Sequence, residues 1–214
     1  MNDYVNENEQ WEAIKAWWKK NGIQLIVVMI IGLAVGFGWR YWESHRLNQK
    51  EAASQLFDQL LSVQTQNPTS DMVERITQVL LKDYSNTVYA PLAVLFEAKT
   101  AVAKNDLPQA EQKLQWALEH IKPPELKQIT RIRLARLLLA EKKPDQAMAL
   151  LDKIDNPGFS AVIEQVKGDI YLTQGQTAKA KEAYQNALNG MPATSSLRPY
   201  VEMELNQLPA SKNI

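Results

Sequence analysis

The sequence predicts an all-α protein in which one apolar N-terminal helix is followed by a solenoid of helical hairpins. Three observations support this fold class. Nineteen residues between Lys20 and Arg40 carry no charge. Small and aromatic residues recur at intervals of about 33 positions in the remainder of the chain. The alternation of apolar and polar residues that is typical of β-strands is absent from the sequence.

The charge-free window predicts a transmembrane helix over residues 21–42. A helix of this length spans about 30 Å, the thickness of the hydrocarbon core of a bilayer. Tryptophans beside basic residues flank both ends, as is typical of membrane–water interfaces. Ala34-Val35-Gly36 resembles a signal-cleavage site, but the acidic leading segment lacks a compact basic region, so we expect an uncleaved anchor. Gly32 and Gly36 have the spacing of a helix-packing motif, although ordinary membrane-helix composition explains them equally well.

The first 20 residues predict an amphipathic helix, because Trp11, Ile14 and Trp18 share one helical face. This helix either lies in the membrane interface or docks on a membrane partner, and then turns into the span at Asn21-Gly22. Alternatively, it lengthens the membrane helix. Three basic residues near each side of the span leave the orientation undecided. The absence of cysteine is compatible with a location outside the cytoplasm but does not require it.

The run "VIEQVKGDIYLTQGQTAKAKEAYQNALNGMP" matches the small, aromatic and proline positions of the 34-residue tetratricopeptide consensus. The matching residues are Gly168, Tyr171, Gly175, Ala180, Tyr184, Ala187 and Pro192. We expect Gly168 and Ala180 to face one another where two antiparallel helices cross, and Gly175 to adopt a positive φ in the turn. Two less regular copies precede this one. The predicted repeats cover about 91–122, 128–158 and 161–192.

Both flanks of the repeats predict capping helices, which a solenoid needs for solubility. At the N-terminal side the residues available for packing are Leu56, Phe57, Leu60, Leu61, Met72, Ile76, Val79 and Leu80. At the C-terminal side they are Tyr200, Met203 and Leu208. The predicted fold is therefore all-α, with a single N-terminal transmembrane helix followed by a tetratricopeptide-like helical-hairpin solenoid over 43–214.

The first helix of each repeat lines the concave face in tetratricopeptide arrays, so the register predicts a groove. Its predicted lining residues are Leu95, Lys99, Val102, Ile132, Arg136, Leu139, Gln165, Asp169 and Leu172. A broad, partly apolar surface of this kind suits an extended polypeptide or a partner's helix. The alternative is that the apolar positions are internal packing or are covered by the N-terminal helices.

The residues that most enzymes require are missing from the sequence. The two histidines, His45 and His120, have no metal ligands at a suitable spacing, and there are no cysteines. Nucleophile-elbow, P-loop and dinucleotide motifs are absent. The chain has 24 basic and 24 acidic residues, so no broad positive field attracts nucleic acid. We therefore expect no catalytic residues, no cofactor, no metal and no enzymatic activity.

The order of these features resembles the YfgM family of bacterial inner-membrane proteins. The similarity covers "NENEQ" at Asn6–Gln10, the approach "KKNG", the exit "GWRYW" at Gly38–Trp42 and the final repeat. Trp17, Trp18, Gly22, Gly32 and Gly36 also match. The resemblance implies a single-pass protein of the inner membrane. Residues 1–20 would be cytoplasmic and residues 43–214 would form a periplasmic tetratricopeptide-like domain.

That family is described as an ancillary subunit of the SecYEG translocon that acts with the membrane-anchored chaperone PpiD. The resemblance therefore implies a non-enzymatic adaptor, chaperone-like, that receives polypeptides emerging in the periplasm. The implied partners are SecYEG, a PpiD-type chaperone, unfolded or nascent secreted polypeptides and the lipid bilayer, and a link to envelope stress is also implied. The alternative function is a membrane-anchored scaffold in envelope assembly, cell division or cytochrome maturation, which would have one fixed partner.

Overall fold

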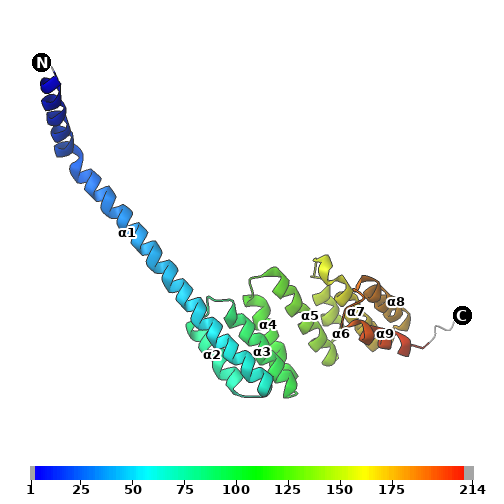
Figure 1. Cartoon of the computed structure of the whole chain (residues 1–214). Helices are drawn as coiled ribbons and strands as arrows, with labels where there is room; N and C mark the ends of the chain where they lie inside the picture. Colours follow the sequence, from blue (N-terminus) through cyan, green and yellow to red (C-terminus); the bar gives the residue numbers. More distant parts are fainter. Residues whose placement is uncertain (1–2, 210–214) are drawn as a thin grey trace. The chain divides into compact units, whose positions relative to one another are not determined.

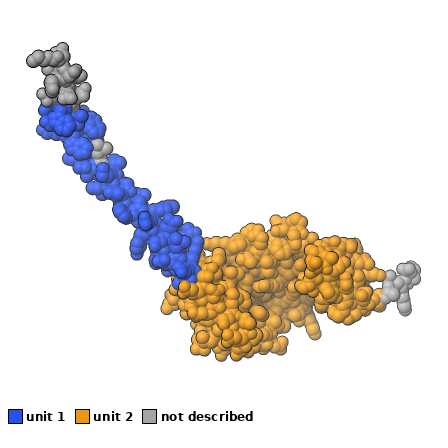
Figure 2. Space-filling view, in the orientation of Figure 1, with its two compact units in different colours: residues 1–52 blue, residues 53–214 orange. Residues whose placement is uncertain are grey.

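The computed structural model describes residues 3–209, which contain helices, turns and loops but no strands. The chain divides into two compact units, residues 1–52 and residues 53–214 (Figure 2). The first helix, α1 (Asp3–Gln66), begins in unit 1 and ends in unit 2. Within the described residues the all-α fold class predicted from the sequence is confirmed.

Unit 1 consists of the N-terminal part of α1. The segment Ile26–Gln66 of α1 contains the one stretch of the described residues that is long and apolar enough to cross a membrane. None of that stretch is buried, and large apolar side chains such as Ile30 and Phe37 are exposed. Such a surface is unfavourable in water and suits a lipid environment. The helix α1 continues through Asn21 and Gly22 without a loop, as in the alternative that the first residues lengthen the membrane helix, and it bends in its N-terminal part (Figure 1).

The N-terminal part of unit 2 packs the end of α1 against α2 (Met72–Asp83) and α3 (Tyr89–Ala103). The Phe57 ring lies 5.4 Å from the Tyr89 ring and 5.7 Å from the Phe96 ring, in tilted and edge-on arrangements. On α2 the buried face includes Val73, Ile76 and Leu80. Three predictions for this region are corrected, because Leu61 on α1 and Met72 and Val79 on α2 fall outside the buried faces of their helices and are exposed.

Three helical hairpins follow one another along unit 2 (Figure 1). The first pairs α3 with α4 (Leu107–His120), and the second pairs α5 (Pro124–Ala140) with α6 (Pro144–Leu151). A short 3-10 turn, η1 (Pro157–Phe159), leads to the third, which pairs α7 (Ser160–Thr173) with α8 (Thr177–Gly190). Each hairpin buries one stripe of its helices against its neighbours, as in stacked repeats.

The turn inside each hairpin repeats one hydrogen-bonded arrangement. Asn105, Lys142 and Gly175 occupy equivalent positions, with φ of 61°, 61° and 72°. The N–H of the next residue donates to the carbonyl oxygen five positions back, at 2.9 Å, 2.8 Å and 2.8 Å in the three turns. This is the Schellman arrangement, which ends a helix with one residue in the left-handed region. The positive φ predicted for Gly175 is confirmed.

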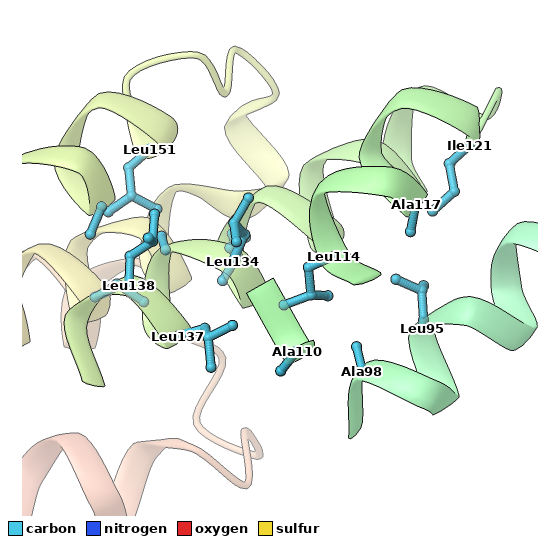
Figure 3. Close-up of a cluster of buried hydrophobic side chains, with 14 of the residues drawn as sticks. Leu95, Ala98, Ala110, Leu114, Ala117, Ile121, Leu134, Leu137, Leu138 and Leu151 are labelled. Carbon is cyan, nitrogen blue, oxygen red and sulfur yellow. The ribbon is translucent and has the colours of Figure 1, made fainter. Parts of the chain in front are cut away.

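The largest core cluster runs through the hairpins and joins α3, α4, α5, α6 and α7 (Figure 3). Alanines at Ala98, Ala101 and Ala110 let α3 and α4 approach closely, and leucines such as Leu134 and Leu138 fill the space between α5 and α6. Small residues at helix crossings and larger ones between layers give the interlocking packing of protein interiors.

The C-terminal cluster corrects two predictions. The three atoms nearest to a would-be Cβ of Gly168 belong to the ring of Tyr184, because this fully buried tyrosine, one turn after Ala180 on α8, crosses the glycine. The final helix, α9 (Arg198–Gln207), covers this cluster with Val201. Tyr200 and Met203, predicted to do so, are instead 44% and 46% exposed, because they lie on the other side of α9. Leu208 packs against the cluster as expected.

Candidate functional site

An open groove of about 660 Å³ runs between α3 and α5. Its walls come from one face of each of these helices, and Leu107 and Leu114 of α4 contribute to its floor. Figure 3 shows Leu114 lying between Leu95 of α3 and Leu137 of α5. The apolar lining residues are Leu92, Leu95, Phe96, Ala98, Val102, Leu107, Leu114, Leu126, Ile129, Leu137 and Ala140.

Helical spacing explains how these side chains come together. On α3 the lining positions lie at, or next to, a spacing of three or four residues that runs from Leu92 through Lys99 to Val102, so they share one face. On α5 the same spacing runs from Leu126 to Ala140. The groove exists because α3 reaches α5 mainly through α4, whereas α5 packs directly against α7. Val102, at 46% exposure, shows that part of this apolar surface faces solvent.

The remaining lining residues are three cations, Lys99, Arg133 and Arg136, and none of the carboxylates in residues 3–209 lines the groove. All three cations are exposed. Within the described residues, neither Lys99 nor Arg133 forms an ion pair or a side-chain hydrogen bond. Arg136 donates from Nη2 to Gln165 Oε1 at 2.7 Å, which links α5 to α7. The groove is therefore apolar along its length and positively charged at its surface.

A chain of polar side chains continues from the groove into the third hairpin. Gln165 donates to Asp169 Oδ2 at 2.6 Å, and the hydroxyl of Tyr184 donates to Asp169 Oδ1 at 2.7 Å. Burial, together with the charge of Glu204 on α9, raises the pKa of Asp169 to about 6, even though these hydrogen bonds and the charge of Arg136 lower it. Burial and the neighbouring Asp169 carboxylate raise the pKa of Tyr184. These contacts hold α5, α7 and α8 in register.

The structure brings together only part of the predicted groove. Leu95, Lys99, Val102 and Arg136 line it. Ile132 is a correction, because it is only 5% exposed and belongs to the core. Leu139 packs against the same core from a partly buried position and does not line the groove. The predicted face of α5 was rotated relative to the true one, because the residues that line the groove include Arg133 and Ala140 rather than their neighbours Ile132 and Leu139.

The three predicted residues of the last repeat also lie outside the groove lining. Gln165 is buried and Asp169 half-buried, both within the polar chain, and Leu172 is exposed elsewhere on α7. Arg133 was missed, although its spacing from Ile129 and Arg136 places all three on one helical face. The α4 contributions were missed because only the first helix of each repeat was considered. Whether any of these residues binds a ligand stays a prediction.

The other candidate residues are the glycines of α1 and the histidines. A Cβ built on Gly32 or Gly36 meets no atom within 4 Å, so both glycines lie on an open face of α1, and their packing against another helix stays a prediction. Among the described residues, no group of three His, Cys, Asp or Glu side chains is arranged to hold a metal ion. His120 stacks on Trp116 with ring centroids 3.8 Å apart, and its Nδ1 lies 2.8 Å from the Trp116 carbonyl oxygen.

Comparison with known proteins identifies the family. The profile of the tetratricopeptide repeat-like domain matches residues 15–210. The chain is 30% identical over 208 residues to the "Ancillary SecYEG translocon subunit" of Escherichia coli (strain K12), covering 97% of this chain and 99% of that protein. It is 31% identical to the protein of the same name from Haemophilus influenzae, covering 95% and 98%. For the Neisseria gonorrhoeae protein of that name the identity is 28%, covering 97% and 100%.

No solved structure matches the chain. The family match covers the membrane helix candidate together with the three hairpins, so it extends over both units. The chain therefore belongs to the tetratricopeptide repeat-like family of ancillary SecYEG translocon subunits, the YfgM family that its terminal motifs resemble.

Proposed function

We propose that this protein is a non-enzymatic subunit of the SecYEG translocon that is anchored in the inner membrane by a single helix. Its repeat domain receives polypeptides that emerge on the periplasmic side, and it acts there with a PpiD-type chaperone. The names of its relatives support the translocon association. The observation that carries the receptor function is the open apolar groove between α3 and α5.

The physical basis of this function is the free energy gained when the apolar surface of the groove is removed from water. Eleven apolar side chains line a cavity of about 660 Å³ that opens to solvent. Covering such a surface with the apolar side chains of an unfolded segment is favourable by roughly 25 cal/mol per Å² of area removed from water. An open groove also accepts segments of different sequence, because it encloses no single shape. These properties suit a protein that holds many different polypeptides briefly.

The proposed topology places residues 1–20 in the cytoplasm, residues 21–42 in the membrane and residues 43–214 in the periplasm. The chain contains no cysteine, so single introduced cysteines report their own location. In intact spheroplasts, a membrane-impermeant maleimide should label Gln112→Cys and should leave Lys15→Cys unlabelled until the membrane is opened. The reverse labelling pattern would exclude a periplasmic groove.

Photo-crosslinking from the groove tests the receptor function. The full-length protein carries a photoreactive phenylalanine analogue at Val102, which lines the groove, or at Gln185, an exposed position on α8 that serves as the control. During secretion in intact cells, the Val102 probe should capture a pulse-labelled exported polypeptide, and the Gln185 probe should not. Equal capture from both positions, or capture from neither, would contradict the assignment to the groove.

Co-purification tests the partners. The full-length chain, extracted from membranes in mild detergent, should recover SecYEG and a PpiD-type chaperone. A variant in which an unrelated anchor replaces residues 1–42 separates contacts made in the membrane from contacts made by the repeat domain. Recovery of cell-division or cytochrome-maturation proteins in place of the translocon would favour the scaffold function instead.

A further inference from the structure

We propose that the groove between α3 and α5 selects apolar polypeptide segments that are flanked by aspartate or glutamate. This inference rests on the proposed function and specifies which polypeptides the groove prefers. It follows from the distribution of charge around the groove, which differs from that of the whole protein.

The first argument is the sign of the charge at the groove. The whole chain has equal numbers of basic and acidic residues, so a random stretch of surface has no preferred sign. The groove lining nevertheless contains three cations, Lys99, Arg133 and Arg136, and no carboxylate. Like charges brought together beside an apolar floor repel one another, since the nearby hydrocarbon screens them less than water does. Carboxylates on an occupant would relieve that repulsion.

The second argument is that three other cations of the same hairpins already have carboxylate partners. Lys104 lies 2.8 Å from Asp71, Lys113 forms an ion pair with Glu97, and Lys143 lies 2.8 Å from Glu111. Lys99 and Arg133 have no such partner within the described part of the chain. Lys127 and Lys142 of the second hairpin also have no ion pair among the described residues, but they do not line the groove, so Lys99 and Arg133 are the cations without a partner beside its apolar floor.

The third argument is that Asp169, the carboxylate linked to Arg136 through Gln165, already accepts two hydrogen bonds. Arg136 donates to Gln165, and Gln165 donates in turn to Asp169. The Asp169 carboxylate also accepts a hydrogen bond from the buried Tyr184, which holds it in the third hairpin. No side chain of the described residues thus brings a carboxylate over the groove itself. The guanidinium of Arg133, which is free of such contacts, suits bidentate contact with an occupant's carboxylate.

A peptide-binding measurement with full-length protein in nanodiscs of neutral lipid tests this selection. Two fluorescent peptides share one Leu- and Val-rich core, flanked by glutamates in one and by lysines in the other. Fluorescence anisotropy should show the glutamate-flanked peptide binding about tenfold more tightly, the size expected of two or three partly exposed charge pairs. Added salt should reduce this difference, because mobile ions screen exposed charges.

Charge reversal identifies the residues responsible. In the double variant Lys99→Glu with Arg133→Glu, the preference should be lost or reversed, and the variant should fold because neither side chain has a partner to lose. The control Lys82→Glu with Lys179→Glu makes the same change of net charge on exposed lysines outside the groove. This control should keep the preference for the glutamate-flanked peptide. Equal loss in both variants would mean that net charge, not the groove, selects the peptide, and would overturn the proposal.

Other outcomes separate this inference from the proposed function. If both peptides bind equally to the natural protein and Val102→Glu weakens both, the groove holds polypeptides without selecting their charge, and only the inference fails. If neither peptide binds and the Val102 photo-probe captures no exported chain, the proposed function fails as well. If micelles of an anionic phospholipid displace the glutamate-flanked peptide and bind more tightly than it does, the occupant is lipid and the inference is overturned.

Discussion

Replacing Gly168 by alanine tests the packing of the last hairpin most directly. A Cβ on residue 168 would lie 2.9 Å from Cζ of Tyr184 and closer still to two other ring carbons. The ring cannot move aside freely, because it is fully buried and its hydroxyl donates to Asp169 at 2.7 Å. Either α7 and α8 separate or the tyrosine loses its position.

The expected loss of stability is the sum of two destabilising effects, overpacking and a displaced hydrogen bond, less the stabilising effect of a better helix propensity. Overpacking of a core by one methyl group costs typically 1–3 kcal/mol, and displacement of a hydrogen bond to a charged group adds roughly 1.5–3 kcal/mol. Alanine recovers about 1 kcal/mol through its better helix propensity. The net cost is therefore about 1.5–5 kcal/mol. For a protein of this size, each kcal/mol lowers the Tm by roughly 2–4 °C.

Thermal unfolding of the full-length protein in detergent, followed by circular dichroism, measures this change. The control is Gly38→Ala on α1, where a Cβ meets no atom within 4 Å, and it should leave the Tm of the repeat domain unchanged. In a Tyr184→Leu background, Gly168→Ala should cost much less, because the clashing ring is gone. A Tm for Gly168→Ala within 1 °C of the natural protein would refute the reasoning.

Three further predictions concern other contacts of unit 2. Lys142→Gly should raise the Tm by about 2 °C, since residue 142 has a φ of 61° that glycine adopts without steric cost; a lower Tm would contradict this. Stability should fall between about pH 4 and pH 6 by up to about 3 kcal/mol, because folding raises the pKa of Asp169 from 3.8 to about 6 and the folded state binds more protons than the unfolded one between these two values. Urea titrations should show this slope, and Asp169→Asn should remove it. Lys113→Met should cost about 3–5 kcal/mol by leaving the Glu97 carboxylate, 6% exposed, without its cation. Adding Glu97→Gln should recover much of that loss in the same titrations.

Patterns that depend on one helix and its immediate neighbours were predictable from the sequence. The charge-free window predicts the apolar helix, because nineteen successive uncharged and mostly apolar residues are rare outside a membrane span. The position of Gly175 in a predicted turn predicts its positive φ, because glycine adopts this backbone conformation at little cost and most other residues do not. The fold class could be predicted because it depends on such local signals repeated along the chain.

Which residues of a helix face the groove or the core was harder to predict, because an error of one residue rotates the predicted face by about 100°. On α5 that error exchanged Arg133 for the buried Ile132. On α9 it exchanged the buried Val201 for the exposed Tyr200. The groove itself depends on how far α3 stands from α5, and the sequence of either helix alone contains no information about that distance.

The division of the core into separate clusters has a consequence for local unfolding. The cluster that contains Tyr184 and Val201 is small and lies at the end of the array, where it has a neighbour on only one side. Repeat arrays open from their ends, so this cluster should exchange its amide hydrogens faster than α4 and α5, which lie between hairpins. Arg136 is hydrogen-bonded to Gln165, so each local opening of α7 would also release one cation of the groove. Fraying at the C-terminal end of the array would then adjust the charge that an arriving polypeptide meets.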